Sequence, residues 1–110
     1  MPSTYNSNNT PSLSWVLGLE LTQDPRCAGY DFSLGHRCDT ETTPRNRDIA
    51  QTFLDMATAH LGAGQGVDYL LEAIAPRVLC SREDHQQQAP VLVARWEREI
   101  AAFEALNNNP

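Results

Sequence analysis

The chain has three cysteines, Cys27, Cys38 and Cys80, and a histidine, His85, soon after the last of them. The spacing is C-x10-C-x41-C-x4-H, so a long connection joins two close pairs of sulfur or nitrogen donors. Structural zinc sites use four such ligands in a tetrahedron and take them in pairs from separate segments. The pattern therefore predicts that Zn²⁺ binds these four residues and holds distant parts of the chain together.

Two other interpretations of the cysteines stay open. Free cysteines are often buried simply as small apolar side chains. Alternatively, Cys27 and Cys38 form a disulfide and Cys80 stays free, although an odd number of cysteines argues against a closed disulfide framework.

The fourth ligand position has three candidate histidines. We place His85 first, because only four residues separate it from Cys80 and both side chains can converge. His36 is second, since its position beside Arg37 in a turn favours exposure. His60 is third, because it falls on the apolar stripe of an expected helix, where a histidine is usually a core residue.

The length of 110 residues allows one domain. Residues 1–12 and 107–110 are mostly polar residues and proline, so we expect disordered tails around a single zinc-stabilised helical domain at residues 13–106. Such a short domain buries only about 60–65% of its surface on folding. Structural zinc contributes about 10–16 kcal/mol in small peptides, against about 5–15 kcal/mol of total stability for ordinary domains. We expect the metal-free protein to be partly or wholly unfolded.

The segment between Cys27 and Cys38 alternates apolar and polar residues and contains glycines near both ends. This pattern predicts a small irregular hairpin with one metal ligand at each end. Before the hairpin, residues 13–21 are apolar, and the spacing of apolar residues alone does not distinguish a helix from a strand in so short a segment. We expect Trp15, with Leu17 or Leu19, to cover part of the core.

Three helices are expected after the hairpin. Thr43-Pro44 begins the first, as N-cap and first-turn residue, and Gly62 ends it. The second begins near Val67 and is interrupted by Pro76. The expected apolar stripe of the first helix consists of Ile49, Phe53, Met56 and His60, with Ala50, Leu54, Ala57 and Leu61 beside it.

The last helix follows Cys80, and Pro90 lies in its first turns or marks its true beginning. Its expected buried stripe is Leu92, Trp96, Ile100 and Phe103. The fold class is α: a small three-helix domain with a short N-terminal metal-binding hairpin.

The formal net charge is −6, and all eight of the Lys and Arg residues are arginine. Proteins that bind nucleic acids normally have a basic face that neutralises phosphates. The charge argues against a nucleic-acid groove. Arg37, Arg45 and Arg47, near the expected metal site, keep a local contact open.

The chain has no phosphate-binding glycine loop, no Gly-x-Ser-x-Gly and no His-Glu-x-x-His. A catalytic zinc would also keep a ligand position for water, whereas four protein ligands favour a closed site. No stretch has the composition of a signal peptide or approaches the roughly 20 apolar residues of a membrane span. We therefore expect a non-enzymatic, intracellular protein, nuclear or cytoplasmic, with reduced thiols and no membrane partner.

The hairpin reads C-x-G…G-x-R-C, and it is followed by a helix, by Val78-Leu79-Cys80 and by His85-Gln86 before a helix that contains a tryptophan. This arrangement resembles small cysteine-rich domains of filamentous-fungal proteins, some of which precede a GIY-YIG-type nuclease domain. The resemblance covers about residues 27–103 and implies zinc binding by Cys27, Cys38, Cys80 and His85. The chain differs in having four residues, where three are expected, between the last two ligands.

These observations favour a zinc-stabilised module that binds another protein, through the exposed side of the last helix and the N-terminal arm. The alternative is a zinc-binding module associated with nucleic acids, in a transcription-related role, as the resemblance and nearby arginines suggest. A small metal-dependent enzyme is a third hypothesis. Pairing of two copies into a homodimer would cover leftover apolar surface.

Overall fold

The computed structural model describes residues 12–108, so residues 1–11 and 109–110 of the expected tails at 1–12 and 107–110 lie outside the described part. The described part is mostly helical, as the sequence predicts. Two short strands, β1 (Tyr30–Asp31) and β2 (His36–Arg37), pair antiparallel in a hairpin. The helices, in chain order, are α1 (Leu13–Val16), α2 (Pro44–Gly62), α3 (Asp68–Ile74), the 3-10 helix η2 (Ala75–Val78), α4 (Glu83–Gln86) and α5 (Ala89–Asn108).

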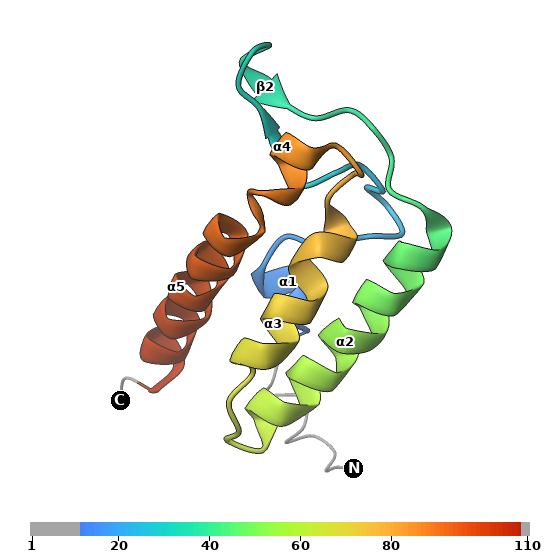
Figure 1. The fold of residues 1–110 in the computed structure, drawn as a ribbon. Coiled ribbons are helices and arrows are strands. Elements are labelled where there is room, and N and C mark those ends of the chain that lie inside the picture. Colours follow the sequence, from blue (N-terminus) through green and yellow to red (C-terminus); the bar gives the residue numbers. More distant parts are fainter. Residues whose placement is uncertain (1–11, 109–110) are drawn as a thin grey trace.

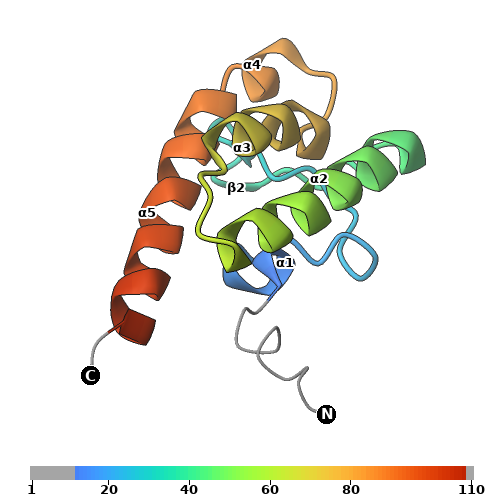
Figure 2. The ribbon, with the colours of Figure 1, turned by 90° about the horizontal axis from the view of Figure 1, so that it is seen from below.

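The three longer helices form the body of the domain, and α3 packs against both α2 and α5 (Figure 1). The hairpin and α4 lie together at one end of these helices, and the loop between α2 and α3 lies at the other (Figure 1). Figure 2 shows α1 under the end of α2, where it packs against α2 and α5. No helix within residues 12–108 has both the length and the apolar character to cross a bilayer.

The helix boundaries confirm several local predictions. Thr43 is the N-cap of α2, and its hydroxyl accepts a hydrogen bond from the backbone N–H of Asn46 at 3.2 Å. Pro76 is the second residue of η2, so the second predicted helix does break there. Pro90 is the second residue of α5, which makes it the marker of that helix's true beginning.

The predicted count of three helices is too low. Residues 13–16 form α1, because the Ser12 hydroxyl accepts a hydrogen bond from the N–H of Ser14 and caps a first turn. Residues 83–86 form α4, which is separate from α5. Pro90 has no backbone N–H, so it cannot donate the hydrogen bond that would join the two helices into one. The hairpin therefore follows a helix and does not open the ordered fold.

The N-terminal arm covers the core with its leucines. Leu13, Leu17 and Leu19 are all buried, as is Leu21. The expectation for Trp15 is wrong, because its side chain is 66% exposed. A four-residue helix presents only one face to the core, and in α1 Leu13 and Ser14 occupy that face. The Trp15 ring instead meets the ring of Phe103 edge-on, with centroids 6.4 Å apart.

The two long helices differ in how well their buried stripes can be predicted. In α5, Leu92, Trp96 and Ile100 are buried, as expected, and Trp96 is fully so. In α2, the fully buried residues are Ala50, Leu54 and Ala57. The sequence predicts these residues beside the buried stripe and not as the stripe itself. Met56, which we expect inside, is exposed. Small alanines on the inner stripe let α2 approach α3 closely, and the larger side chains lie towards its edges.

The end of α2 also differs slightly from the prediction. Gly62 is the last helical residue, and the backbone reverses at Gly64, whose φ of +77° lies in the left-handed region. Gly64 is therefore the glycine that the turn requires.

Candidate metal centre

The structure brings the four predicted ligands together. The ligand atoms of Cys27, Cys38, Cys80 and His85 lie within 4.8 Å of one another, and all four residues are buried. Nδ1 of His85 is 3.7 Å from Sγ of Cys27 and 3.2 Å from Sγ of Cys80. In a tetrahedral zinc site, bonds of about 2.3 Å to sulfur and about 2.0–2.1 Å to nitrogen place these donor atoms about 3.5–3.8 Å apart. The cluster therefore has the size and the donor types of a four-coordinate metal site.

The other two candidate histidines lie elsewhere. His36 is exposed on β2, where its Nδ1 is 2.7 Å from the carbonyl oxygen of Arg37. His60 is half-buried on α2, with its Nδ1 3.3 Å from the hydroxyl of Tyr69. Neither belongs to the cluster. The three cysteines are all free thiols, so the structure has no disulfide between Cys27 and Cys38.

The first ligand is positioned by backbone pairing on both sides. The N–H of Cys27 donates to the carbonyl of Thr40, and the N–H of Ala28 donates to that of Val78, both at 2.7 Å. The N–H of Cys38 donates to the carbonyl of Gly29 at 2.9 Å, which closes the base of the hairpin. These bonds hold the hairpin segment between the strand-like residues before α2 and the end of η2.

Backbone N–H groups also point at the sulfurs. Cys27 Sγ accepts from the N–H of Gly29 at 3.2 Å and from the N–H of Cys80 at 3.1 Å. Cys38 Sγ accepts from the N–H of Thr40 at 3.4 Å. Such bonds favour the charged thiolate, which is the form that binds a metal. In the folded protein they also fix the direction in which these two sulfurs point.

The metal-free thiols have very different proton affinities. Burial raises the pKa of the Cys27 thiol to about 11, and the adjacent Cys80 thiol adds to the rise. For Cys38, burial is the largest single influence and raises the pKa, but hydrogen bonds with Thr40, Cys27 and Cys80 together outweigh it, so the pKa is lowered. A bound dication would reverse the effect of burial, because a coordinated thiol loses its proton outright. Without a cation the buried Cys27 thiol therefore keeps its proton at neutral pH, whereas a bound cation would hold it as the thiolate.

Gly29 lies directly against the centre. A Cβ atom at this position would be 3.2 Å from Cys27 Sγ, from Cγ of His85 and from Cδ2 of Leu79. Any larger residue would push on two ligands at once. The glycine that sequence analysis expects to loosen the hairpin backbone is needed here for space.

Arginine side chains brace the loops around the site. Arg37 donates to the carbonyl oxygens of Cys27 and Arg26, both at 3.0 Å, and pairs with the carboxylate of Asp24 at 2.8 Å. Hydrogen bonds from Arg26 and Arg37 hold the pKa of Asp24 well below its usual range. Those from Arg26 have the largest effect and exceed the opposing effect of partial burial. The arginine of the C-x-G…G-x-R-C pattern thus has a structural role beside the first ligand.

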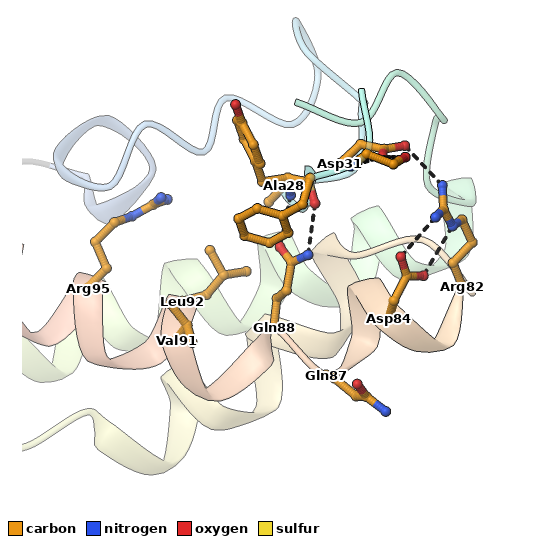
Figure 3. Close-up of a pocket in the computed structure, with 12 residues that line it drawn as sticks. Ala28, Asp31, Arg82, Asp84, Gln87, Gln88, Val91, Leu92 and Arg95 are labelled. Atoms are coloured by element: carbon orange, nitrogen blue, oxygen red, sulfur yellow. Dashed lines mark hydrogen bonds and ion pairs between the residues drawn. The ribbon is translucent and has the colours of Figure 1, made fainter. Parts of the chain in front are cut away.

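A second arginine links the hairpin to α4. Arg82 donates to Asp31 on β1 at 3.1 Å and to Asp84 on α4 at 2.8 Å, as Figure 3 shows. A hydrogen bond from Ser33, followed by those from Arg82, lowers the pKa of Asp31. In addition, the Gln88 side chain bridges both the N–H and the carbonyl of Tyr30 (Figure 3). The segments that carry the two ligand pairs are therefore joined by side chains as well as by the cluster.

Gln86 is a site residue that sequence reasoning misses. Its side-chain amide lies 3.0 Å from the carbonyl oxygens of Pro76 and Cys80 and 3.3 Å from that of Leu79, and its nitrogen is the donor. It holds the turn that delivers Cys80 and starts α4. In the sequence, only its position directly after His85 points to this role, and a glutamine at such a position can have many other roles.

His85 has one unsatisfied nitrogen. With Nδ1 facing the sulfurs, Nε2 points the other way, is buried and has no hydrogen-bond partner within the described residues. The nearest charged group is the carboxylate of Asp84, 3.8 Å away. Metal-bound histidines usually donate their second N–H to a carboxylate or carbonyl. Asp84, whose carboxylate also pairs with Arg82, is the candidate for that role.

Comparison with known proteins adds no relative. No protein-family model matches the chain, and neither a curated protein nor a solved structure resembles it significantly. The chemistry of the site therefore has to be inferred from its own residues.

Proposed function

We propose that this protein is a non-enzymatic, zinc-stabilised module that binds another protein. Zn²⁺ would be held by Cys27, Cys38, Cys80 and His85, and its role would be structural. Four protein ligands complete a tetrahedron, so no coordination position is left for a reacting water. The resemblance to small cysteine-rich fungal domains supports this assignment of the metal, and thiolate ligation implies a reducing, intracellular compartment.

The observation that carries the proposal is the apolar surface that the metal centre would hold in place. On the hairpin, Phe32 is 78% exposed and its ring packs against that of Tyr30, with centroids 5.0 Å apart. Val91 on α5 is 68% exposed across from them. These side chains surround a hollow of about 490 Å³ whose floor includes Ala28 and Leu92 (Figure 3).

Exposed aromatic and aliphatic side chains around a hollow are typical of a protein-binding surface. We call these three residues, Tyr30, Phe32 and Val91, the hairpin surface. The Arg82 ion pairs and the Gln88 bridge keep it rigid, which reduces the entropy lost on binding.

The nucleic-acid alternative has less support from the arginines. Within residues 12–108, six of the eight arginines already contact a carboxylate, carbonyl or amide oxygen of the protein. Only Arg45 and Arg98 have no such described contact. Arg37 and Arg47 brace loops through these contacts and do not form a basic face.

The test compares the zinc-loaded protein with two variants, Phe32→Ser and the control Met56→Ser. Met56 is an exposed apolar residue on α2, outside the hairpin surface. Proteins captured from cell extract are identified and purified, and their direct binding to each variant is measured by calorimetry. We expect a partner whose affinity drops at least about tenfold with Phe32→Ser, the loss typical of a central contact residue, and changes little with Met56→Ser.

Three results would decide against this function. Binding of DNA or RNA that weakens steeply with salt would favour the nucleic-acid alternative. Self-association in sedimentation experiments, lost with Phe32→Ser, would make the partner a second copy. Turnover of a substrate by the zinc form would revive the enzyme hypothesis.

A further inference from the structure

A second groove runs along the other flank of α5, between α5 and α3. A hollow of about 400 Å³ lies beside Pro90 and Val93, and one of about 340 Å³ lies beside Ile100 and Ala101. Glu97 lines both, so the two hollows meet at this residue. The lining residues of α5 span positions 89 to 104, which is about 22 Å of helix at 1.5 Å per residue.

The floor of this groove is apolar and shallow enough for close approach. Buried Leu71 and Ile100 form its base at one end, and the half-buried side chains of Val93 and Ala94 form it at the other. Small residues on a helix face let a second helix pack at short distance. The length and floor therefore suit about four turns of a partner helix laid alongside α5.

The walls of the groove are acidic. Asp68 and Glu72, one turn apart on α3, face Glu97 and Glu104 of α5 across it. None of these four carboxylates forms an ion pair with any residue in the described range, whereas Asp24, Asp31, Asp39, Asp84 and Glu99 all pair with arginines. Loss of hydration, together with a hydrogen bond to Asp68 and repulsion by Asp68 and Glu72, raises the pKa of Glu97.

Unpaired like charges along an apolar groove call for a positively charged occupant. We infer that the groove between α3 and α5 binds a basic amphipathic helix of a partner protein, with the apolar face of that helix on the groove floor and its Lys or Arg residues against the four carboxylates. The chain contains no lysine and few unpaired arginines, so a second copy of it does not supply such a helix within the described residues. This site is distinct from the hairpin surface.

The experiment uses the zinc-loaded full chain and two fluorescently labelled synthetic peptides of 15 residues. The basic peptide forms an amphipathic helix with Leu and Ala on one face and Lys on the other, and in the acidic peptide every Lys is replaced by Glu. Binding is followed by fluorescence anisotropy at low and physiological salt. We expect the basic peptide to bind, with weaker binding at higher salt, and the acidic peptide not to bind.

Matched variants separate the groove from general attraction to an acidic protein. The double change Glu72→Gln and Glu97→Gln should lower the affinity about fivefold to tenfold, as expected for two exposed charge pairs. The control pair Glu20→Gln and Glu41→Gln removes the same charge at exposed positions elsewhere and should change it less than about twofold. Because the groove variant removes repulsion, it should remain folded by circular dichroism.

Blocking the floor provides an independent test. Ala101→Tyr places a large ring in the groove and should abolish binding of the basic peptide, whereas Phe32→Ser should leave it unchanged. Any of three results would overturn the inference. The groove variant and the control variant could lose peptide affinity equally, the peptide could still bind after Ala101→Tyr, or the folded zinc-loaded protein could fail to bind the basic peptide at all. Loss of binding with Phe32→Ser alone would instead assign the peptide to the hairpin surface.

Discussion

Replacement of Gly29 by alanine tests how tightly the metal centre is packed. The added methyl group would lie 3.2 Å from Cys27 Sγ, His85 Cγ and Leu79 Cδ2, so each neighbour would have to move by a few tenths of an ångström. Overpacking of this kind costs about 1–3 kcal/mol. The φ of Gly29 is not in the left-handed region, so alanine is allowed there and removes unfolded-state entropy worth about 0.4–1 kcal/mol. We expect a net loss of about 1–2 kcal/mol.

The measurement is urea unfolding of the zinc-loaded protein, followed by far-ultraviolet circular dichroism, with Gly66→Ala as the control. Gly66 has no positive φ and no atom within 4 Å of an added Cβ, so its replacement should stabilise the protein by about 0.4–1 kcal/mol. Since two ligands must move in Gly29→Ala, its affinity for zinc in a chelator competition should fall about tenfold or more. If Gly29→Ala behaved like Gly66→Ala in both assays, the ligands would not be packed as described.

Other predictions follow from single features of the structure. Cys80→Ser should reduce both zinc affinity and helix content in circular dichroism, whereas Ser81→Ala, one residue further on, should keep both. Trp96→Ala empties the centre of the core and should cost about 3–5 kcal/mol in urea unfolding, enough to unfold a marginal domain. Thr43→Ala removes the α2 cap and should cost about 1 kcal/mol in the same assay. Removal of zinc by a strong chelator should turn a cooperative thermal transition into a broad one or abolish it, and added Zn²⁺ should restore it.

The helix boundaries were predictable because they depend on single residues with strong local preferences. Thr43-Pro44 can cap a helix whatever lies around it, and Pro76 and Pro90 lack the N–H that a continuing helix needs. Apolar residues in α2 fall on two adjacent stripes, and nothing local says which of them faces the core. The choice of Ala50 and Leu54 over Met56 is made by the close approach of α3, which is a tertiary effect.

The candidate metal site was predictable from residue types, because few arrangements other than a metal centre bring three cysteines and a histidine into one cluster. The groups that support it were not. Gln86 and Arg37 act through backbone carbonyls of segments up to eleven residues away, and any polar residue can do so. The acidic groove likewise exists only because α3 and α5 pack side by side, which brings Asp68 next to Glu97.

The most direct test of the account is metal analysis of natively purified protein combined with zinc X-ray absorption spectroscopy. We expect one zinc per chain with three sulfur neighbours at about 2.3 Å and one nitrogen at about 2.0–2.1 Å. A folded protein without metal, or a zinc shell that contains fewer than three sulfurs, would contradict it.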